Sequence, residues 1–247
     1  MSVSAVLGWM YFISWSASFY PQVLLNCSRK SAEGLSPQYV QLNLLGFSLY
    51  TVYTSALYFS PTVRLQYRER WGSDNQIQLN DVVFAIHALI MCAVMSIQAA
   101  LYPNTLHHDR NLIIISLAIV SPILAALFQC IQLLDVLYYF AGVKMIITLI
   151  KYLPQLHLNN ARKSTRGWSI GNIILDLSGG LLSILQSIVD ANDDGWKSIA
   201  GNPIKIGLGV ASIVFDFIFI YQHYFIFHQN YEDEEDARHL MDQEGEL

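Results

Sequence analysis

Apolar residues run through the chain in long blocks, and this pattern predicts its fold class. Seven blocks are each roughly 20 residues long, enough for a helix to cross a hydrocarbon core about 30 Å thick. They cover approximately residues 3–25, 38–59, 81–102, 112–134, 136–156, 170–190 and 204–227. Only a weak polar break near Leu134 and Asp135 separates the fourth block from the fifth. We therefore predict an all-α membrane protein with seven transmembrane helices.

The composition agrees with a membrane protein and excludes other classes. Charged residues make up only 13% of the chain and hydrophobic residues 53%, whereas charged residues form about a quarter of a soluble domain. The net charge of −5 comes mostly from an acidic stretch that begins at Glu232. No basic patch suits nucleic acid. The three cysteines are not placed as a disulfide framework.

An eighteen-residue segment occurs twice, each time at the end of one apolar block and before the next. The copies lie at 19–36 and 152–169, a constant offset of 133 residues. Beyond the segment the same offset pairs Asn43 with Asp176. Duplicated units of this kind are typical of membrane carriers, so transport is the first hypothesis. Within the segment the offset pairs identical residues: Pro21 with Pro154, Gln22 with Gln155, Asn26 with Asn159, Arg29 with Arg162, Lys30 with Lys163, Ser31 with Ser164 and Gly34 with Gly167.

The order of the blocks predicts how the two copies are oriented. Three helices, a linker helix and three more helices place four crossings between equivalent positions, so both repeats face the same way. Such parallel repeats are related by an axis along the membrane normal, and substrate binds on that axis near the middle of the membrane. We expect a first repeat at 1–103, a linker helix at 104–134, a second repeat at 135–228 and an acidic cytosolic tail at 229–247.

The repeated prolines, Pro21 and Pro154, each lie near the end of an apolar block. Proline removes a backbone donor and disfavours helix for the residue before it. A kink that only shapes the bundle would explain either proline alone. Their recurrence in both halves, each followed by a glutamine (Gln22 and Gln155), favours a hinge that opens and closes one face of a carrier.

Several ionisable side chains fall within apolar blocks, where charges are costly and mark functional sites by default. Asp176 and Asp216 lie in the sixth and seventh blocks, and Lys144 and Lys151 share one face of the fifth. Because burial disfavours an ionised carboxylate, such a group could load a proton in an acidic lumen and release it in the cytosol. The structural alternatives are an Asp–Lys pair that never titrates or a carboxyl group satisfied by hydroxyl and backbone partners. Asp81 begins the third block, where it could also be a helix cap.

The chain shows no arrangement typical of an enzyme. It has no Ser/His/Asp set, phosphate-binding loop or pair of catalytic carboxylates. His107 and His108 are adjacent in a connecting segment and lack the spacing of metal ligands. We therefore expect a protein that is not an enzyme and has no metal or cofactor, apart from protons as coupling ions.

The two Pro-Gln segments resemble those of the PQ-loop family, carriers with a SWEET-like plan of three helices, a linker helix and three helices. The similarity covers about residues 5–228. Longer strings narrow the resemblance to the cystine–proton symporters of lysosomes and vacuoles within this family. These strings lie at 15–22, 34–36, 42–46, 80–84, 151–155, 163–180 and 215–223.

This resemblance implies proton-coupled export of L-cystine from the lysosome or vacuole lumen to the cytosol by alternating access. It also implies a multi-pass protein with a lumenal N-terminus and a cytosolic C-terminus. Arg29 and Lys30, which follow an uncharged first block, favour the same orientation of the N-terminus. By matching motif, the cystine site comprises Asn43, Lys144, Lys151, Tyr152, Asn172 and Asp176, walled by Trp15 and Phe19, and protons bind Asp81, Asp176 and Asp216.

The charges of cystine, two carboxylates and two ammonium groups, suit this set of residues. Lys144 and Lys151 would bind carboxylate, Asp176 would bind ammonium, and Asn43 could donate or accept. A PQ-loop carrier of a cationic amino acid or a sugar is the nearest alternative, although a neutral sugar would not need these charges. A seven-helix retrieval receptor that binds a peptide C-terminus is a further alternative, but it would need a strongly basic cavity.

The acidic tail adds one prediction about partners other than membrane lipid. Residues 236–241 resemble an acidic dileucine signal with methionine in the last place. They therefore predict sorting adaptors as partners, with a merely solvated acidic tail as the alternative.

Overall fold

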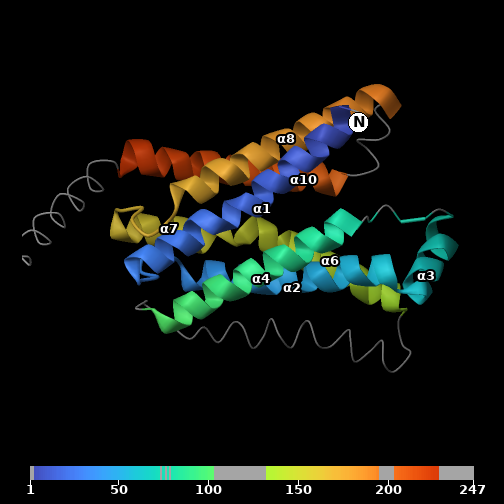
Figure 1. Ribbon diagram of the computed structural model, residues 1–247, viewed down its shortest axis with the longest axis horizontal. Helices are drawn as coiled ribbons and strands as arrows, with labels where there is room; N and C mark the ends of the chain where they lie inside the picture. The colour runs from blue at the N-terminus through green and yellow to red at the C-terminus, as the bar shows by residue number, and fades with distance from the viewer. Residues whose placement is uncertain are drawn as a thin grey trace, which may run out of the picture. The chain divides into compact units, whose positions relative to one another are not determined.

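The computed structural model describes residues 3–72, 74–75, 77, 79–102, 132–194 and 203–227, and its regular elements in these ranges are all helices (Figure 1). The linker helix expected at 104–134 lies, up to residue 131, outside the described residues. The loop histidines His107 and His108 and the acidic tail also lie outside them.

Six of the seven predicted blocks form helices close to the expected bounds. In the part of the chain that the structure describes, four segments are long and apolar enough to cross a membrane: Asp81–Leu101, Leu133–Arg162, Ile170–Val189 and Gly209–Ile226. The chain is thus a multi-pass membrane protein, and the regular elements of its described residues are helices. Its helices are α1 (Val3–Arg29), α2 (Pro37–Phe59), α3 (Pro61–Trp71), α4 (Leu79–Leu101), α6 (Leu133–Ile150), α7 (Tyr152–Arg162), α8 (Ile170–Asp194) and α10 (Pro203–Tyr221), the last continued by the π-helix η1 (Gln222–Ile226).

The short helix α3 was not predicted, because it is polar and has no apolar run. Its ends carry their own signals. The Ser60 side chain accepts a hydrogen bond from the Val63 backbone N–H at the start of α3. Gly72 ends the helix with a φ of 69°, a left-handed conformation that glycine adopts at little cost. An ion pair joins Arg68 to Asp74, just beyond this end.

The two repeated prolines differ in their local effect. Lys151 separates α6 from α7, three residues before Pro154. Pro154, like Pro21, has no backbone N–H for the carbonyl one turn earlier, so the proline alone does not account for this break. By contrast, α1 runs through Pro21 without interruption. The same residue thus lies within a continuous helix in the first half and near a break between two helices in the second.

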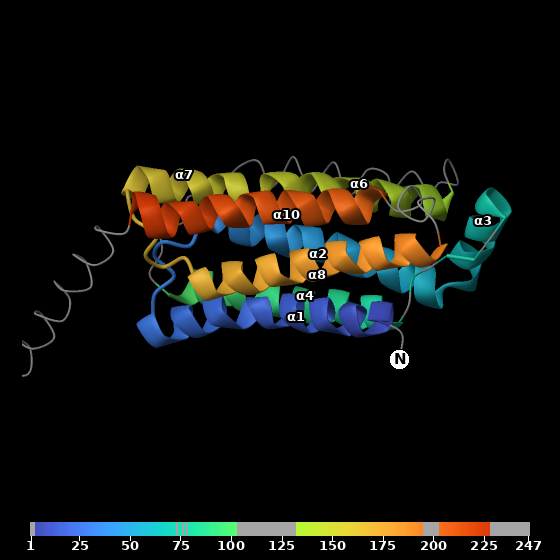
Figure 2. The same cartoon turned by 90° about the horizontal axis from the view of Figure 1, so that it is seen from above.

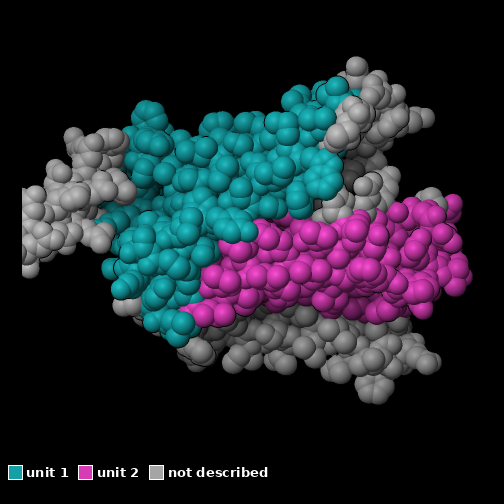
Figure 3. Space-filling model, in the orientation of Figure 1, with its two compact units in different colours: residues 1–36, 98–104, 152–247 teal, residues 37–97, 105–151 magenta. Residues whose placement is uncertain are grey.

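The chain forms two compact units, and each takes helices from both halves of the sequence (Figure 3). Unit 1 holds α1, α7, α8 and α10, and in it α8 packs against both α1 and α10 (Figures 1 and 2). Unit 2 holds α2, α3, α6 and most of α4, and in it α2 packs against α6. Unit 1 comprises residues 1–36, 98–104 and 152–247, and unit 2 comprises 37–97 and 105–151.

The sequence repeat relates a helix pair in one unit to a helix pair in the other. The offset of 133 residues maps α1 onto α6 and α2 onto α8, so the α1–α8 pair corresponds to the α6–α2 pair. In each pair the two helices pack closely at a glycine, and the two glycines occupy the same position of the repeat. Gly46 of α2 faces Ile147, and Gly179 of α8 faces the Trp15 ring so closely that a Cβ there would overlap it. Small residues permit such close packing of membrane helices.

Candidate functional site

Each repeated glutamine bonds the loop at the end of the Pro-Gln segment of the other half. In unit 1, the Gln22 side chain donates to the Gly167 carbonyl at 2.9 Å and accepts from the Ser169 N–H at 2.8 Å. Gln155 makes the equivalent bonds, to the Gly34 carbonyl at 2.8 Å and from the Ser36 N–H at 2.7 Å. Both glutamines are fully buried. We call these six residues, Gln22, Gly34, Ser36, Gln155, Gly167 and Ser169, the Pro-Gln clasp.

A second layer of buried amides holds the two glutamines in place. Gln22 also donates to Asn26 at 3.0 Å, and Gln155 donates to Asn159 at 2.9 Å. Each asparagine in turn donates to a further glutamine: Asn26 to Gln98 of α4 and Asn159 to Gln222 of η1, both at 3.0 Å. Buried polar networks with this degree of satisfaction rigidify a structure.

The clasp needs glycine at both loop positions. Gly34 has a φ of 93° and Gly167 a φ of 90°, where a residue with a Cβ is strained. A Cβ on Gly34 would also overlap the Arg166 carbonyl oxygen, and a Cβ on Gly167 would overlap that of Glu33. The two loops thus approach each other backbone to backbone, which explains why glycine recurs at this position of the repeat.

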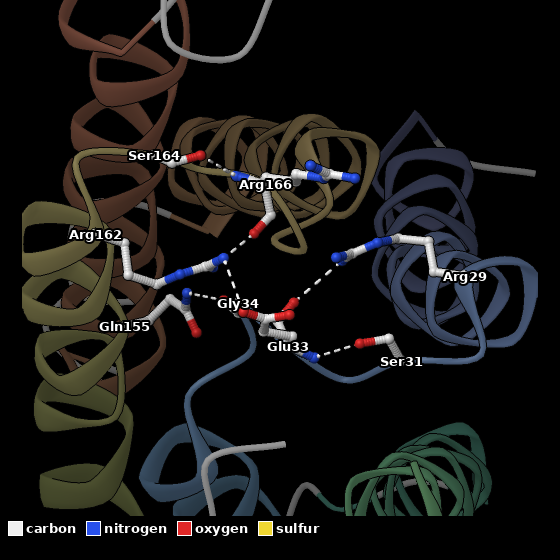
Figure 4. Close-up of polar contacts among 8 residues, drawn as sticks. All are labelled: Arg29, Ser31, Glu33, Gly34, Gln155, Arg162, Ser164 and Arg166. Atoms are coloured by element: carbon white, nitrogen blue, oxygen red, sulfur yellow. Dashed lines mark hydrogen bonds and ion pairs between the residues drawn. The ribbon is translucent and has the colours of Figure 1, made fainter. Parts of the chain in front are cut away.

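The arginines beside the clasp make equivalent backbone contacts in the two halves, but the charges of the two loops differ (Figure 4). Arg29 donates to the Glu33 carbonyl at 3.1 Å, and Arg162 donates to the Arg166 carbonyl at 2.9 Å. The Glu33 carboxylate lies 3.7 Å from the Arg162 guanidinium. The residue equivalent to Glu33 is Arg166, so the second loop carries the opposite charge. The clasp is symmetric in hydrogen bonds and asymmetric in charge.

Asp176 is the centre of a second group of predicted residues in unit 1. Its Oδ2 accepts hydrogen bonds from the Tyr152 hydroxyl and the Ser212 hydroxyl, both at 2.9 Å. The indole N–H of Trp15 donates to the Asp176 backbone carbonyl at 3.2 Å. Asp216 is fully buried one turn after Ser212, and its Oδ2 lies 3.5 Å from the Ser212 Oγ. Four helices, α1, α7, α8 and α10, thus contribute residues to the group around Asp176.

Aromatic rings fix the Tyr152 phenol beside Asp176. The Tyr152 ring lies 5.1 Å from the ring of Phe215 and 5.8 Å from that of Phe219. The other predicted residues of unit 1 lie one turn from this group: Phe19 after Trp15 and Asn172 before Asp176, both partly buried. The backbone N–H of Asn172 bonds the Ser169 hydroxyl at 3.3 Å, which connects α8 to the clasp.

Unit 2 contains the predicted lysines and Asn43. Lys151 donates to the buried Asn43 side chain at 3.1 Å and lies 5.8 Å from the centre of the Tyr39 ring. Lys144 donates to the Thr148 hydroxyl at 2.7 Å. It also lies 5.5 Å from the centres of two rings, those of Phe47 and Tyr50. Aromatic faces attract such cations electrostatically.

Two consecutive residues therefore bond to repeat-equivalent partners. Lys151 bonds Asn43 within unit 2, and Tyr152 bonds Asp176 within unit 1. The remaining predicted proton site, Asp81, lies in the first turn of α4. A carboxylate is electrostatically favoured there, because the helix N-terminus carries a partial positive charge.

Sequence reasoning missed several residues of these groups. Ser212 was detectable only as a hydroxyl one helical turn before Asp216, a spacing too common to carry an inference. Asn26 and Asn159 were matched by the repeat, but no role was assigned to them. Gln98 and Gln222 lie outside the repeated segment, so no sequence signal connected them to it.

Comparison with known proteins extends these observations. The model of the PQ loop repeat family matches residues 3–63 and 136–196. Cystinosin of Drosophila melanogaster is 43% identical over 236 residues, which cover 93% of this chain and 59% of the fly protein. A cystinosin homolog of Dictyostelium discoideum is 41% identical over 231 residues, covering 91% of this chain and 81% of that protein. The chain belongs to the cystinosin family.

A yeast relative and the spacing of the two repeat matches agree with this assignment. A Saccharomyces cerevisiae protein named cystine transporter is 30% identical over 249 residues, which cover 90% of this chain and 93% of the yeast protein. The two matches to the PQ loop repeat begin and end 133 residues apart, the offset of the duplicated segment. The chain spans about three fifths of the length of the Drosophila cystinosin that it matches.

Proposed function

We propose that this cystinosin-family protein exports L-cystine from the lysosome or vacuole lumen to the cytosol, coupled to protons, by alternating access. The observation that carries the proposal is the pair of polar contacts at repeat-equivalent positions: Lys151 on Asn43, and Tyr152 on Asp176. A duplicated membrane carrier with a cation at one position and an anion at the other suits a zwitterionic substrate. Relatives named cystinosin and cystine transporter support cystine as that substrate.

The lysines suit the carboxylates of cystine. Lys144 donates to the Thr148 hydroxyl and Lys151 to the Asn43 side chain, and both lie near the faces of aromatic rings. A substrate carboxylate can replace that oxygen as hydrogen-bond acceptor, so the lysine keeps its number of bonds. The gain comes from exchanging a neutral acceptor for a charged one, since charge-assisted hydrogen bonds are roughly twice as strong as neutral ones.

Asp176 suits both the ammonium group of cystine and the coupling proton. Its Oδ2 accepts hydrogen bonds from two hydroxyls. Among the described contacts Oδ1 is then open to a substrate ammonium group, and the carboxylate can take up the coupling proton. Loading in the acidic lumen and deprotonation on the cytosolic side would then make transport depend on the proton gradient. Asp81 and Asp216 are proposed as further proton-binding positions. Trp15, Phe19, Asn172 and Tyr152 complete the proposed site.

The Pro-Gln clasp is proposed as the closed state of one gate. Opening would break the four bonds that the two glutamines make to the opposite loops. At about 1 kcal/mol net for each bond, the clasp would favour closure by about 4 kcal/mol. Differential binding of substrate and protons can shift a two-state equilibrium by this much. Pro21 and Pro154 are proposed as its hinges, and the acidic tail as a site for sorting adaptors.

Uptake of labelled cystine into proteoliposomes, driven by an imposed proton gradient, tests this function. Cystine uptake that collapses with the gradient supports it. Uptake of arginine without cystine would favour a cationic amino-acid carrier. Binding of a peptide C-terminus without transport of either would favour a retrieval receptor. Either of these last two outcomes would overturn the proposal.

A further inference from the structure

We propose that the Ser212 hydroxyl relays a proton between Asp216 and Asp176, an inference that rests on the proposed proton-coupled function. Its Oγ lies 2.9 Å from Asp176 Oδ2 and 3.5 Å from Asp216 Oδ2. The same oxygen atom thus faces both carboxyl groups. Because a hydroxyl both donates and accepts, it can join them into one hydrogen-bonded chain.

The burial of Asp216 explains why a relay is needed. Asp216 is 0% exposed, whereas Ser212 is 8% exposed and Asp176 is partly buried. A proton bound at Asp216 therefore needs a neighbouring group to reach it, and Ser212 is a hydroxyl neighbour one helical turn away on the same face of α10. The 3.5 Å contact is longer than an ordinary O–H···O hydrogen bond, so transfer from Asp216 requires a small movement that shortens it.

The surrounding elements supply the other polar groups of this site. The Tyr152 hydroxyl of α7 donates to Asp176 Oδ2, the oxygen that Ser212 also contacts. From α1, the Trp15 indole N–H reaches the Asp176 backbone carbonyl. Asp176 comes from α8, which packs against α10. Tyr152 orients the receiving carboxylate, while Ser212 is the group that contacts both carboxyls.

The transfer conserves atoms and charge. The Ser212 O–H bond breaks as its proton joins Asp176, while the proton of Asp216 moves to the Ser212 oxygen. Serine is a hydroxyl before and after the step. The net change is one proton moved from Asp216 to Asp176, with one carboxylate and one carboxylic acid on each side of the equation. No other reactant is required.

The variants Ser212→Ala and Ser212→Thr separate a relay from a structural hydrogen bond. Ser96→Ala is the matched control, because the Ser96 hydroxyl bonds only its own helix at the Cys92 carbonyl among the contacts described for it. We compare proton-driven net cystine uptake with cystine–cystine exchange at equal pH, which needs no net proton transfer. Ser212→Ala, like Tyr152→Phe, removes one hydroxyl donor to Asp176 and should lower the exchange rate by roughly 10-fold. It should lower net uptake by roughly a further 100-fold, a typical effect of losing a positioned proton-transfer group.

Ser212→Thr, which keeps the hydroxyl, should restore net uptake, and Ser96→Ala should behave as the wild type. Equal losses of exchange and net uptake in Ser212→Ala, without recovery in Ser212→Thr, would show a structural role and overturn the relay. Unchanged net uptake in Ser212→Ala would also overturn it. A wild-type protein that does not transport cystine would instead contradict the proposed function.

Infrared spectroscopy tests the relay without any substrate. The carboxylic-acid band of Asp216, assigned by its loss in Asp216→Asn, should exchange its proton for deuterium more slowly in Ser212→Ala than in the wild type. The same exchange rate in both proteins would contradict the relay, whatever the substrate of the carrier.

Discussion

The Tyr152 hydroxyl donates a 2.9 Å hydrogen bond to the Asp176 carboxylate. Tyr152 is also the first residue of α7, directly after the break at Lys151. The break between α6 and α7 therefore lies beside the residue that binds the partly buried carboxyl group of Asp176. A change in helix geometry near Pro154 would move the donor of this bond, which connects the proposed hinge to the proposed proton site.

Tyr152→Phe removes the donor to Asp176 but keeps the ring that packs on Phe215 and Phe219. Hydrogen bonds to charged groups contribute about 1.5–3 kcal/mol, so we expect cystine transport to fall by roughly 10-fold or more. Initial rates of cystine uptake measure the effect. Tyr221→Phe is the control, because that tyrosine is exposed and, among the described residues, stacks on Phe225. Equal rates in both variants would contradict a role for the hydroxyl.

Gln22→Leu and Gln155→Leu should have similar effects, because the two glutamines make equivalent bonds. Each substitution leaves a buried loop carbonyl and a buried serine N–H without their side-chain partner, at a cost of about 1–3 kcal/mol for each group. We expect both variants to open the clasp. Hydrogen exchange of the loops at 30–36 and 163–169 measures it directly. Faster exchange in only one variant would contradict the reciprocal clasp.

Gly34→Ala and Gly167→Ala should destabilise the protein more than Gly72→Ala. All three glycines have a positive φ, so alanine carries a conformational cost of about 1–2 kcal/mol at each position. Of the three, Gly34 and Gly167 would also place a Cβ onto the opposite loop, whereas a Cβ at Gly72 has no described atom within 4 Å beyond its chain neighbours. Thermal unfolding of the purified variants gives the comparison. Three equal shifts in Tm would show that the loops do not meet.

Acid should release the contact between α3 and the residues that follow it. The hydrogen bond from Arg68 lowers the pKa of Asp74 below its ordinary value. The pair therefore contributes stability above the unfolded-state pKa of Asp74, and this contribution is lost as pH falls through the lower folded-state value. Both side chains are exposed, so the effect is small and screened by salt. Hydrogen exchange at the end of α3, followed against pH, should lose this dependence in Asp74→Asn.

The repeat in the sequence predicted equivalence between the two halves but not contact between them. An offset of 133 residues aligned Gln22 with Gln155, which led to the interpretation of a hinge. That each glutamine bonds the loop of the other half is a property of the packed chain, and no local pattern contains it. The apolar blocks located six helices, whereas α3 was missed because it is short and polar and has no apolar run.

The candidate site likewise contains residues that the sequence predicted and one that it did not. The cost of charge in a membrane pointed to Asp176, Asp216 and Lys151 from their surroundings in the sequence alone. Ser212 has no such signal, because a serine is inexpensive in a helix and common at every position. Its significance depends on two carboxyl groups, one of them on another helix, and therefore on tertiary structure.

The most direct test of proton-coupled cystine transport is the cystine-evoked current, recorded over a series of lumenal pH values in the wild type and in Asp176→Asn. Size-exclusion chromatography of both proteins controls for folding. The wild-type current should rise as lumenal pH falls, and Asp176→Asn should lose this dependence. A current in Asp176→Asn with the same dependence on lumenal pH as the wild type would contradict the account.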